Sequence, residues 1–228
     1  MVLCFVLALL TRVDAHAAPS AASSDRSSKT AEERTARAHR EVAAIATRYE
    51  SSDSSNDCRA VDAHYERFRR SDSYASTSED ARQILTFVSS RCDLILDRED
   101  AARTKLNGLR SSRLLAGFAS FTLAMLDVDA MDAERAETVE VVLANLERSV
   151  PDQIADLPVV TVDKLADAAT LSREPTHATR FFALIDGSGW QARNPFDLLD
   201  QHRRHHALSL ASRDSAAARA EASKLTHP

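Results

Sequence analysis

The chain of 228 residues is long enough for one large domain or two small ones, and its apolar fraction of 44% is typical of a globular protein. Only four glycines are present, which argues against phosphate-cradling loops and hairpin-rich sheets, because both need glycine at special backbone positions. The net charge of −5 comes without a basic stripe interleaved with aromatic residues, which argues against nucleic acid as a partner.

Residues 1–17 are predicted to form a signal peptide. The first residues, MVLCFVLALL, make an uncharged apolar run, and AHA at 15–17 supplies an A-x-A cleavage site. The run is shorter than the roughly 20 apolar residues that span a bilayer, so we expect a secreted or periplasmic protein with no membrane span after cleavage. No Lys or Arg precedes the run, which makes a retained amino-terminal anchor the alternative. Residues 18–29 are rich in Ser and Ala and are predicted to be a flexible tether.

Helices near the amino terminus are predicted from apolar residues that recur three and four positions apart. A capping-box pattern starts a first helix at Thr30, and this helix ends near Tyr49. A short helix over 58–68 and a stronger one over 84–96 flank a polar turn at 71–78. Because one short turn joins these two helices, we expect them to form an antiparallel hairpin.

The predicted hairpin places Cys58 and Cys92 at similar distances from its turn. Removal of Cys4 with the signal peptide leaves these two as an even pair in an oxidising compartment, which favours a disulfide between them. In the chain-entropy model such a bond stabilises the fold by roughly 4 kcal/mol. Two buried free thiols are the alternative. Neither state indicates redox catalysis, because the chain has no C-x-x-C motif.

The middle of the chain combines an uncharged helix with an acidic one. The segment 114–126 carries no charge and has the length of a buried core helix, not of a membrane span. The acidic helix covers 136–150 and ends at Pro151; its carboxylates predict a solvated face, with docking against a basic helix of this protein or a partner as the alternative. A calcium loop begun at Asp127 would lack its glycine and its glutamate. Acidic residues at a helix amino terminus explain better the cluster of Asp127, Asp129 and Asp132.

After Pro158 the predicted elements are less regular. Within 152–171, valines at 159, 160 and 162 indicate a short extended segment before a small helix. Helices are predicted from Thr176 to Gly187 and from Asn194-Pro195 to His206, the second with Asn as its cap. Residues 212–228 are predicted to be a frayed, Ala-rich tail.

Together these elements predict an all-α fold, an irregular bundle of about seven to nine helices in one helical domain over 30–211. No repeat of fixed period is apparent, which argues against a solenoid. The most regular apolar stripes predict a core that includes Leu115, Phe118, Leu143, Leu146, Phe181 and Phe182.

Two patterns resemble sites without completing one. His202 and His206 stand four residues apart and could place two imidazoles on one metal ion, but no H-E-x-x-H motif or third ligand accompanies them. We therefore interpret them as surface histidines on a basic helix, with metal binding as the alternative. The segment DGSG at 186–189 is not the G-x-S-x-G of a nucleophile elbow and is predicted to be a helix cap and turn.

The segment IATRYES at 45–51 resembles the helix that carries the catalytic glutamate of lytic transglycosylases. The resemblance implies that Glu50 is a general acid whose pKa is raised by burial. The glycine-rich segment that should follow is absent from 51–70, so we reject this assignment.

The function expected from these observations is binding rather than catalysis. The chain is predicted to be an exported inhibitor, adaptor or immunity-type envelope protein with a protein partner, no catalytic residue and no cofactor. A hydrolase with a site assembled from separate helices is the first alternative, and a metal-binding protein that uses His202 and His206 is the second. A deep pocket would favour an enzyme if it brought together two or more of Glu50, Asp127, His177, His202 and His206.

Overall fold

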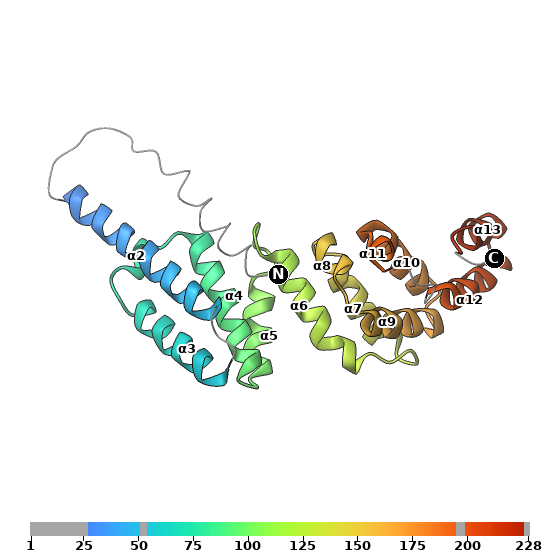
Figure 1. The fold of residues 1–228 in the computed structure, drawn as a ribbon, viewed down its shortest axis with the longest axis horizontal. Helices are drawn as coiled ribbons and strands as arrows, with labels where there is room; N and C mark the ends of the chain where they lie inside the picture. Colours follow the sequence, from blue (N-terminus) through green and yellow to red (C-terminus); the bar gives the residue numbers. More distant parts are fainter. Residues whose placement is uncertain (1–26, 51–53, 195–198, 226–228) are drawn as a thin grey trace. The chain divides into compact units, whose positions relative to one another are not determined.

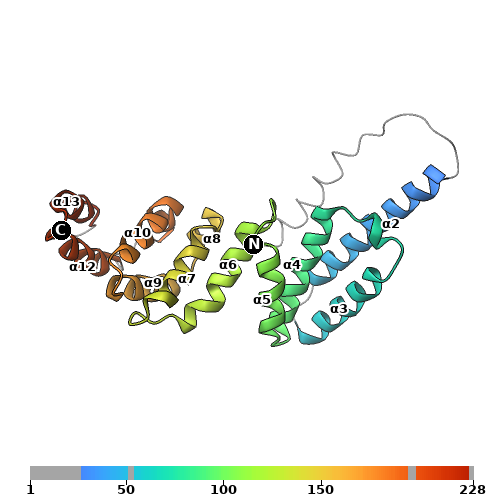
Figure 2. The same cartoon turned by 180° about the vertical axis from the view of Figure 1, so that it is seen from behind.

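A computed structural model describes residues 27–50, 54–194 and 199–225. Within these ranges the protein has 12 α-helices, two short 3-10 helices and no strand, which confirms the all-α helical bundle (Figures 1 and 2). The number of α-helices exceeds the predicted seven to nine partly because short helices, such as α8 and α11, connect longer ones. The predicted signal peptide and most of the predicted tether lie outside the described residues. The chain divides into two compact units, one ending at Leu115 and the other beginning at Ala116.

Unit 1 contains the predicted hairpin. Helices α3 and α4 pack against each other, α2 contacts both, and α5 packs against α4. Serine hydroxyls cap two of the helices: Ser54 accepts the backbone N–H of Asp57, and Ser78 accepts that of Ala81. Thr30 lies inside its helix rather than at the start. The elements of unit 1 are α2 (Ser27–Glu50), α3 (Ser55–Arg69), η2 (Tyr74–Ser76), α4 (Glu79–Ile95) and α5 (Glu99–Gly108).

Unit 2 consists of three successive helix pairs, α6/α7, α9/α10 and α12/α13. Helix α7 packs against α10, and α9 packs against α12, so each pair contacts the next one. The elements are α6 (Ala116–Asp127), η3 (Val128–Ala130), α7 (Ala136–Leu146), α8 (Pro151–Ala155), α9 (Val159–Leu171), α10 (Thr176–Ser188), α11 (Trp190–Arg193), α12 (Asp200–Ala211) and α13 (Ser215–Ala222). The first helices of the pairs begin at residues 116, 159 and 200, so the structure repeats about every 40 residues although the sequence shows no such repeat.

The prediction of an extended segment after Pro158 is wrong, whereas the small helix predicted after it is present as part of α9. Val159 begins helix α9, and Val162 is fully buried in the core of unit 2 together with Leu165, Ala166 and Ala169. Their spacing of three and four residues matches a helix. This pattern of burial outweighs the preference of neighbouring valines for strands, because strand propensity depends strongly on context.

Helix α10 ends later than predicted, and α13 occupies part of the expected tail. Gly187 lies within α10, and Gly189 ends the helix with a φ of +74°. Glycine suits this cap because it adopts left-handed backbone angles without a steric penalty. In the range 212–228, helix α13 buries Ala218 and Glu221.

The predicted core is confirmed, since the side chains of all six predicted residues are at most 8% exposed: Leu115, Phe118, Leu143, Leu146, Phe181 and Phe182. Trp190 is also fully buried in unit 2, and its indole N–H donates to the carbonyl of Leu157 at 2.8 Å. Among the described helices, none is both long and apolar enough to cross a membrane.

Candidate functional site

The two cysteines of the hairpin form a buried thiol pair. Cys58 on α3 and Cys92 on α4 are both free thiols with no exposed surface. Burial, followed by a hydrogen bond with Cys58, raises the pKa of Cys92. Burial also raises the pKa of the neighbouring Tyr49, whose hydroxyl accepts a hydrogen bond from Arg91 at 3.5 Å. Cys92 is therefore held in its thiol form, and both side chains are shielded from solvent, which does not suit a nucleophilic thiolate.

The two histidines predicted as weak metal ligands face different helices. His202 Nε2 lies 3.1 Å from a carboxylate oxygen of Asp163 on α9, and His206 Nε2 lies 3.2 Å from the hydroxyl of Thr179 on α10. Among the described residues, no three His, Cys, Asp or Glu side chains converge as a metal site. The interpretation as surface histidines is wrong for His206, which is 3% exposed and stacks on Phe182 at a centroid distance of 5.5 Å.

The three acidic residues predicted to lie at one helix amino terminus belong to three different elements. Asp127 is the last residue of α6, Asp129 lies in η3, and Asp132 lies in the loop before α7. Asp129 accepts from Lys164 at 3.0 Å, and Asp132 accepts the backbone N–H of Glu134 at 2.9 Å. Asp129 and Asp132 thus have separate partners. The expected helix-dipole explanation is wrong for Asp127, which stands at a carboxyl end.

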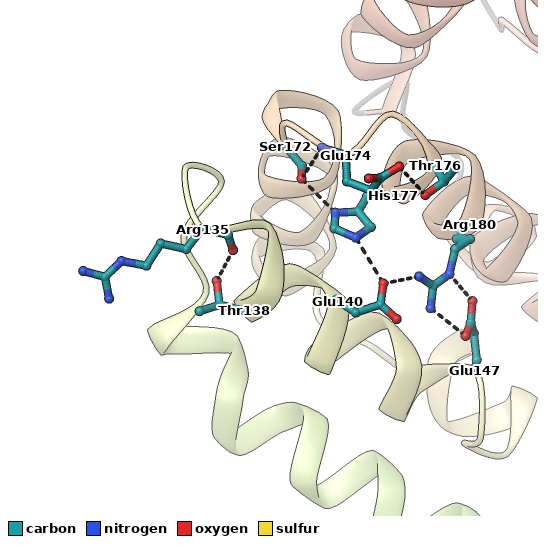
Figure 3. A network of polar contacts seen from close by, with 9 residues as sticks. All are labelled: Arg135, Thr138, Glu140, Glu147, Ser172, Glu174, Thr176, His177 and Arg180. Atoms are coloured by element: carbon teal, nitrogen blue, oxygen red, sulfur yellow. Dashed lines mark hydrogen bonds and ion pairs between the residues drawn. The ribbon is translucent and has the colours of Figure 1, made fainter.

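A series of polar contacts around His177 connects three parts of unit 2 (Figure 3). His177 on α10 is 1% exposed; its Nδ1 lies 2.8 Å from the hydroxyl of Ser172, and its Nε2 lies 3.1 Å from a carboxylate oxygen of Glu140 on α7. Arg180 also binds Glu140 and holds Glu147 through two hydrogen bonds of 2.6 and 2.8 Å. The hydrogen bond from Arg180 lowers the pKa of Glu140; burial opposes this, and His177 adds to it.

The order hydroxyl, imidazole, carboxylate is also that of the serine hydrolases. Here, however, Ser172 follows the last residue of α9, and its hydroxyl oxygen accepts the backbone N–H of Glu174 at 3.2 Å. A hollow of about 190 Å³ in unit 2 has Glu147 in its wall but neither Ser172 nor His177. The contacts therefore act as a tie between α7, α10 and the end of α9, and substrate has no evident route to the imidazole through that hollow.

A buried arginine organises the last helix pair. Arg203 on α12 is 1% exposed, forms ion pairs with Asp186 and Glu221, and lies over the ring of Phe182 with its guanidinium carbon 4.5 Å from the centroid. Lys224 Nζ adds contacts of 2.7 Å to Asp186 and 3.3 Å to Glu221. The sequence did not single out Arg203, because it lies within the polar run DQHRRHH at 200–206, in which no apolar spacing signals burial.

A comparable cluster in unit 1 surrounds the buried Asp93, which is 2% exposed. Its carboxylate accepts from Arg98 at 2.9 Å and from Lys105 Nζ at 2.6 Å, and Lys105 also donates to Ser89 at 2.7 Å. Arg98 reaches Asp62 on α3 as well. These contacts connect α3, α4 and α5, so this cluster too holds helices together.

Of the residues expected to mark an enzyme, the three histidines lie among the described residues, and no hydrogen bond joins any two of them. His177 contacts Glu140 and Ser172, which the sequence did not single out, while His202 and His206 have the separate partners given above. The side chain of Glu50 lies outside the described residues. The chain matches no protein-family model, and no curated protein or solved structure is significantly similar to it.

Proposed function

We propose that this chain is an exported binding protein without catalytic activity. The observation that carries the proposal is the succession of three helix pairs in unit 2, each of which packs on the next. Arrays of this kind leave a series of helix surfaces in contact with solvent, and repeat proteins use such surfaces to bind partners. The buried polar clusters support the same conclusion, because their groups are engaged in holding helices together.

The outer side of α9 is the surface that we assign to a protein partner. Val160 and Leu171 are 74% and 60% exposed, which is high for large apolar side chains. They stand about three helical turns apart, which places them within roughly 20° of each other around the helix axis. Lys164 and Asp167 lie between them and are exposed as well. Apolar residues at both ends with charges between them suit a helix or loop of another protein.

Site-specific crosslinking in the native host tests this assignment. A photoreactive residue at Val160 and, separately, at Leu171 should crosslink to the same discrete protein, and Val160→Glu should abolish the product formed from position 171. Arg213 is the control position, because it is exposed in unit 2 and lies outside α9. Absence of a product from both α9 positions, or an equal product from position 213, would contradict the proposal.

Export carries two covalent consequences, cleavage after Ala17 and a disulfide between Cys58 and Cys92. The contact between the two buried thiols supports the disulfide. Its formation removes one hydrogen from each thiol and reduces the disulfide of a thiol oxidase to a dithiol. Protein from the native host should begin at Ala18 and lack the two thiol hydrogens in an intact mass spectrum. Intact Met1, or alkylation of both cysteines in denaturant without a reductant, would contradict these assignments.

A hydrolase is the second candidate, and the contacts from Ser172 through His177 to Glu140 favour it. A fluorophosphonate probe distinguishes the two proposals, because it labels an activated serine. The binding proposal expects no labelling, whereas labelling that disappears in Ser172→Ala would establish the hydrolase.

A further inference from the structure

Arginines of α2 and α3 surround two adjoining hollows in unit 1. The first has a volume of about 230 Å³ and the second about 530 Å³, and Arg37 lies in the wall of both. The first hollow is lined by Arg37, Glu41, His64, Arg67, Phe68 and Ser71. The second is lined by Glu33, Arg34, Arg37, Arg40, Asp72 and Ser73.

The carboxylates near the first hollow are already engaged, whereas its arginines are not. Glu41 lies 2.8 Å from His64, and Glu66 lies 3.0 Å from Arg69. Arg37 and Arg67 have no ion pair or hydrogen bond with any described residue. The wall of the first hollow therefore contains two exposed arginines that pair with no described carboxylate. An anion bound in this hollow would give both arginines a charged hydrogen-bond partner.

We propose that the first hollow binds the phosphate or sulfate group of a monoester, held between Arg37 and Arg67. A guanidinium group offers two parallel N–H donors that match the oxygens of such a group. The volume is below the roughly 300 Å³ at which pockets for whole drug-sized ligands begin, so it suits a compact anionic group. The adjoining hollow, with three arginines and two carboxylates in its wall, accommodates the organic part of the ligand.

Isothermal titration of the full-length mature protein at low ionic strength tests the site, with inorganic phosphate and inorganic sulfate as probes. We expect saturable binding with a Kd in the millimolar range or below and a loss of about tenfold or more in Arg37→Gln and in Arg67→Gln. Arg213→Gln is the matched control, since it removes the same charge from an exposed arginine of unit 2. Circular dichroism verifies that each variant remains folded.

Two outcomes of this titration would overturn the proposal. The first is that neither phosphate nor sulfate shows saturable binding to the wild-type protein at concentrations up to about 10 mM. The other is an equal loss in Arg213→Gln, which would show that general charge attraction, not a site, holds the anion. The α9 variant Val160→Glu should leave phosphate binding unchanged, so failure of the partner assignment and failure of this site can be told apart.

The source of the monoester follows from a second pair of probes. Vesicles of phosphatidylcholine with phosphatidic acid present the phosphate monoester on a lipid, and glycerol phosphate presents it in solution. Binding to the vesicles that requires Arg37 and Arg67, and is absent with phosphatidylcholine alone, assigns a lipid headgroup. Binding of glycerol phosphate alone, with the same dependence on the arginines, assigns a soluble ligand. Either of these results supports the site. If the protein binds neither the phosphatidic acid vesicles nor glycerol phosphate, the proposal is overturned.

Discussion

His206 is a buried histidine that resists protonation in the folded protein. Burial lowers its pKa from the ordinary 6.5; Glu221 opposes this shift, and Arg203 and Lys224 add to it. As the pH falls below about 6.5, the unfolded chain therefore takes up a proton that the folded chain refuses. The stability linked to the neutral form of His206 should therefore be fully present above pH 6.5. It should be lost as the pH falls toward the lower pKa that His206 has in the folded state.

The prediction is that replacement of His206 removes part of this loss. The unfolding free energy of the wild type should fall between pH 7.5 and 5, and His206→Gln should show a smaller fall because glutamine does not titrate. His205→Gln is the control, since His205 is exposed on the same helix. Urea unfolding across this pH range measures the difference. Parallel pH curves for the wild type and His206→Gln would mean that His206 does not contribute.

Arg203 is the residue whose loss should affect the last helix pair most. Replacement by methionine keeps much of the side-chain volume but leaves Glu221, which is 9% exposed, without its buried partner. Breaking a buried ion pair from one side typically costs 3 to 5 kcal/mol, and Lys224 offsets part of this, so we expect a loss of about 3 kcal/mol. Thermal or urea unfolding measures the change, with Arg213→Met as control. A loss below about 1 kcal/mol would show that the cluster is effectively solvated.

The burial of single apolar residues could be predicted from the sequence more readily than the partners of buried polar side chains. Phe181 and Leu143 follow from the spacing of apolar residues along one helix, which needs only local information. The partners of Arg203 are 17 and 18 residues away on other helices, and Glu140 is 37 residues from His177. Such contacts depend on how the helix pairs pack, which no short motif encodes.

At the scale of elements, the close contact between α6 and the loop that joins α7 to α8 should make Gly117 hard to replace. A methyl group there would lie 2.8 Å from a side-chain carbon of Val150 and 3.3 Å from its backbone nitrogen. Alanine favours a helix over glycine by about 1 kcal/mol, but overpacking costs about 1 to 3 kcal/mol, and the β-branched Val150 has little freedom to move. Gly117→Ala should therefore destabilise the protein.

Gly187 provides the matched control for this prediction. It lies within α10, and a methyl group there would meet no atom within 4 Å, so Gly187→Ala should be neutral or stabilising by up to about 1 kcal/mol. Val150→Ala should rescue Gly117→Ala in a double-mutant cycle, because it removes the nearest atom. If both glycine variants change the unfolding free energy in the same direction, packing at Gly117 is not the cause.

Long amphipathic helices could be predicted from the sequence, while short or polar ones could not. Helix α4 has a continuous apolar stripe, which identifies it and places its carboxyl end within one residue, although the helix begins at Glu79, five residues before the stripe. Helix α5 buries only Ala102 and Leu106 and is otherwise polar, so its pattern is too sparse to recognise. The start of helix α9 was predicted to be extended because its first residues are valines, although its later apolar residues have helical spacing.

At the scale of the whole molecule, repetition exists in structure without repetition in sequence. The first helix of each pair in unit 2 must bury one side against its neighbours, and very different residues satisfy this requirement. Helix α6 is nearly uncharged, whereas α12 buries Arg203 and His206 among charged neighbours. A search for recurring residues therefore misses a period of about 40 residues that the helix ends show directly. The boundary between the two units, at Leu115 and Ala116, carries no proline, and only the four polar residues RSSR at 110–113, in the turns just before it, mark it in the sequence.

The division into two units predicts two separable unfolding transitions, because each unit has buried residues of its own that can form an independent core. Trp190 is the only tryptophan of the chain and is fully buried in unit 2, so its fluorescence reports on that unit. Leu85→Ala in α4 and Leu143→Ala in α7 each truncate a side chain that is at most 1% exposed, at a cost of about 2 to 5 kcal/mol. Leu85→Ala should lower the urea midpoint seen by circular dichroism and leave the fluorescence midpoint unchanged, whereas Leu143→Ala should lower the fluorescence midpoint. If Leu85→Ala shifts both signals equally, the chain unfolds as one cooperative body.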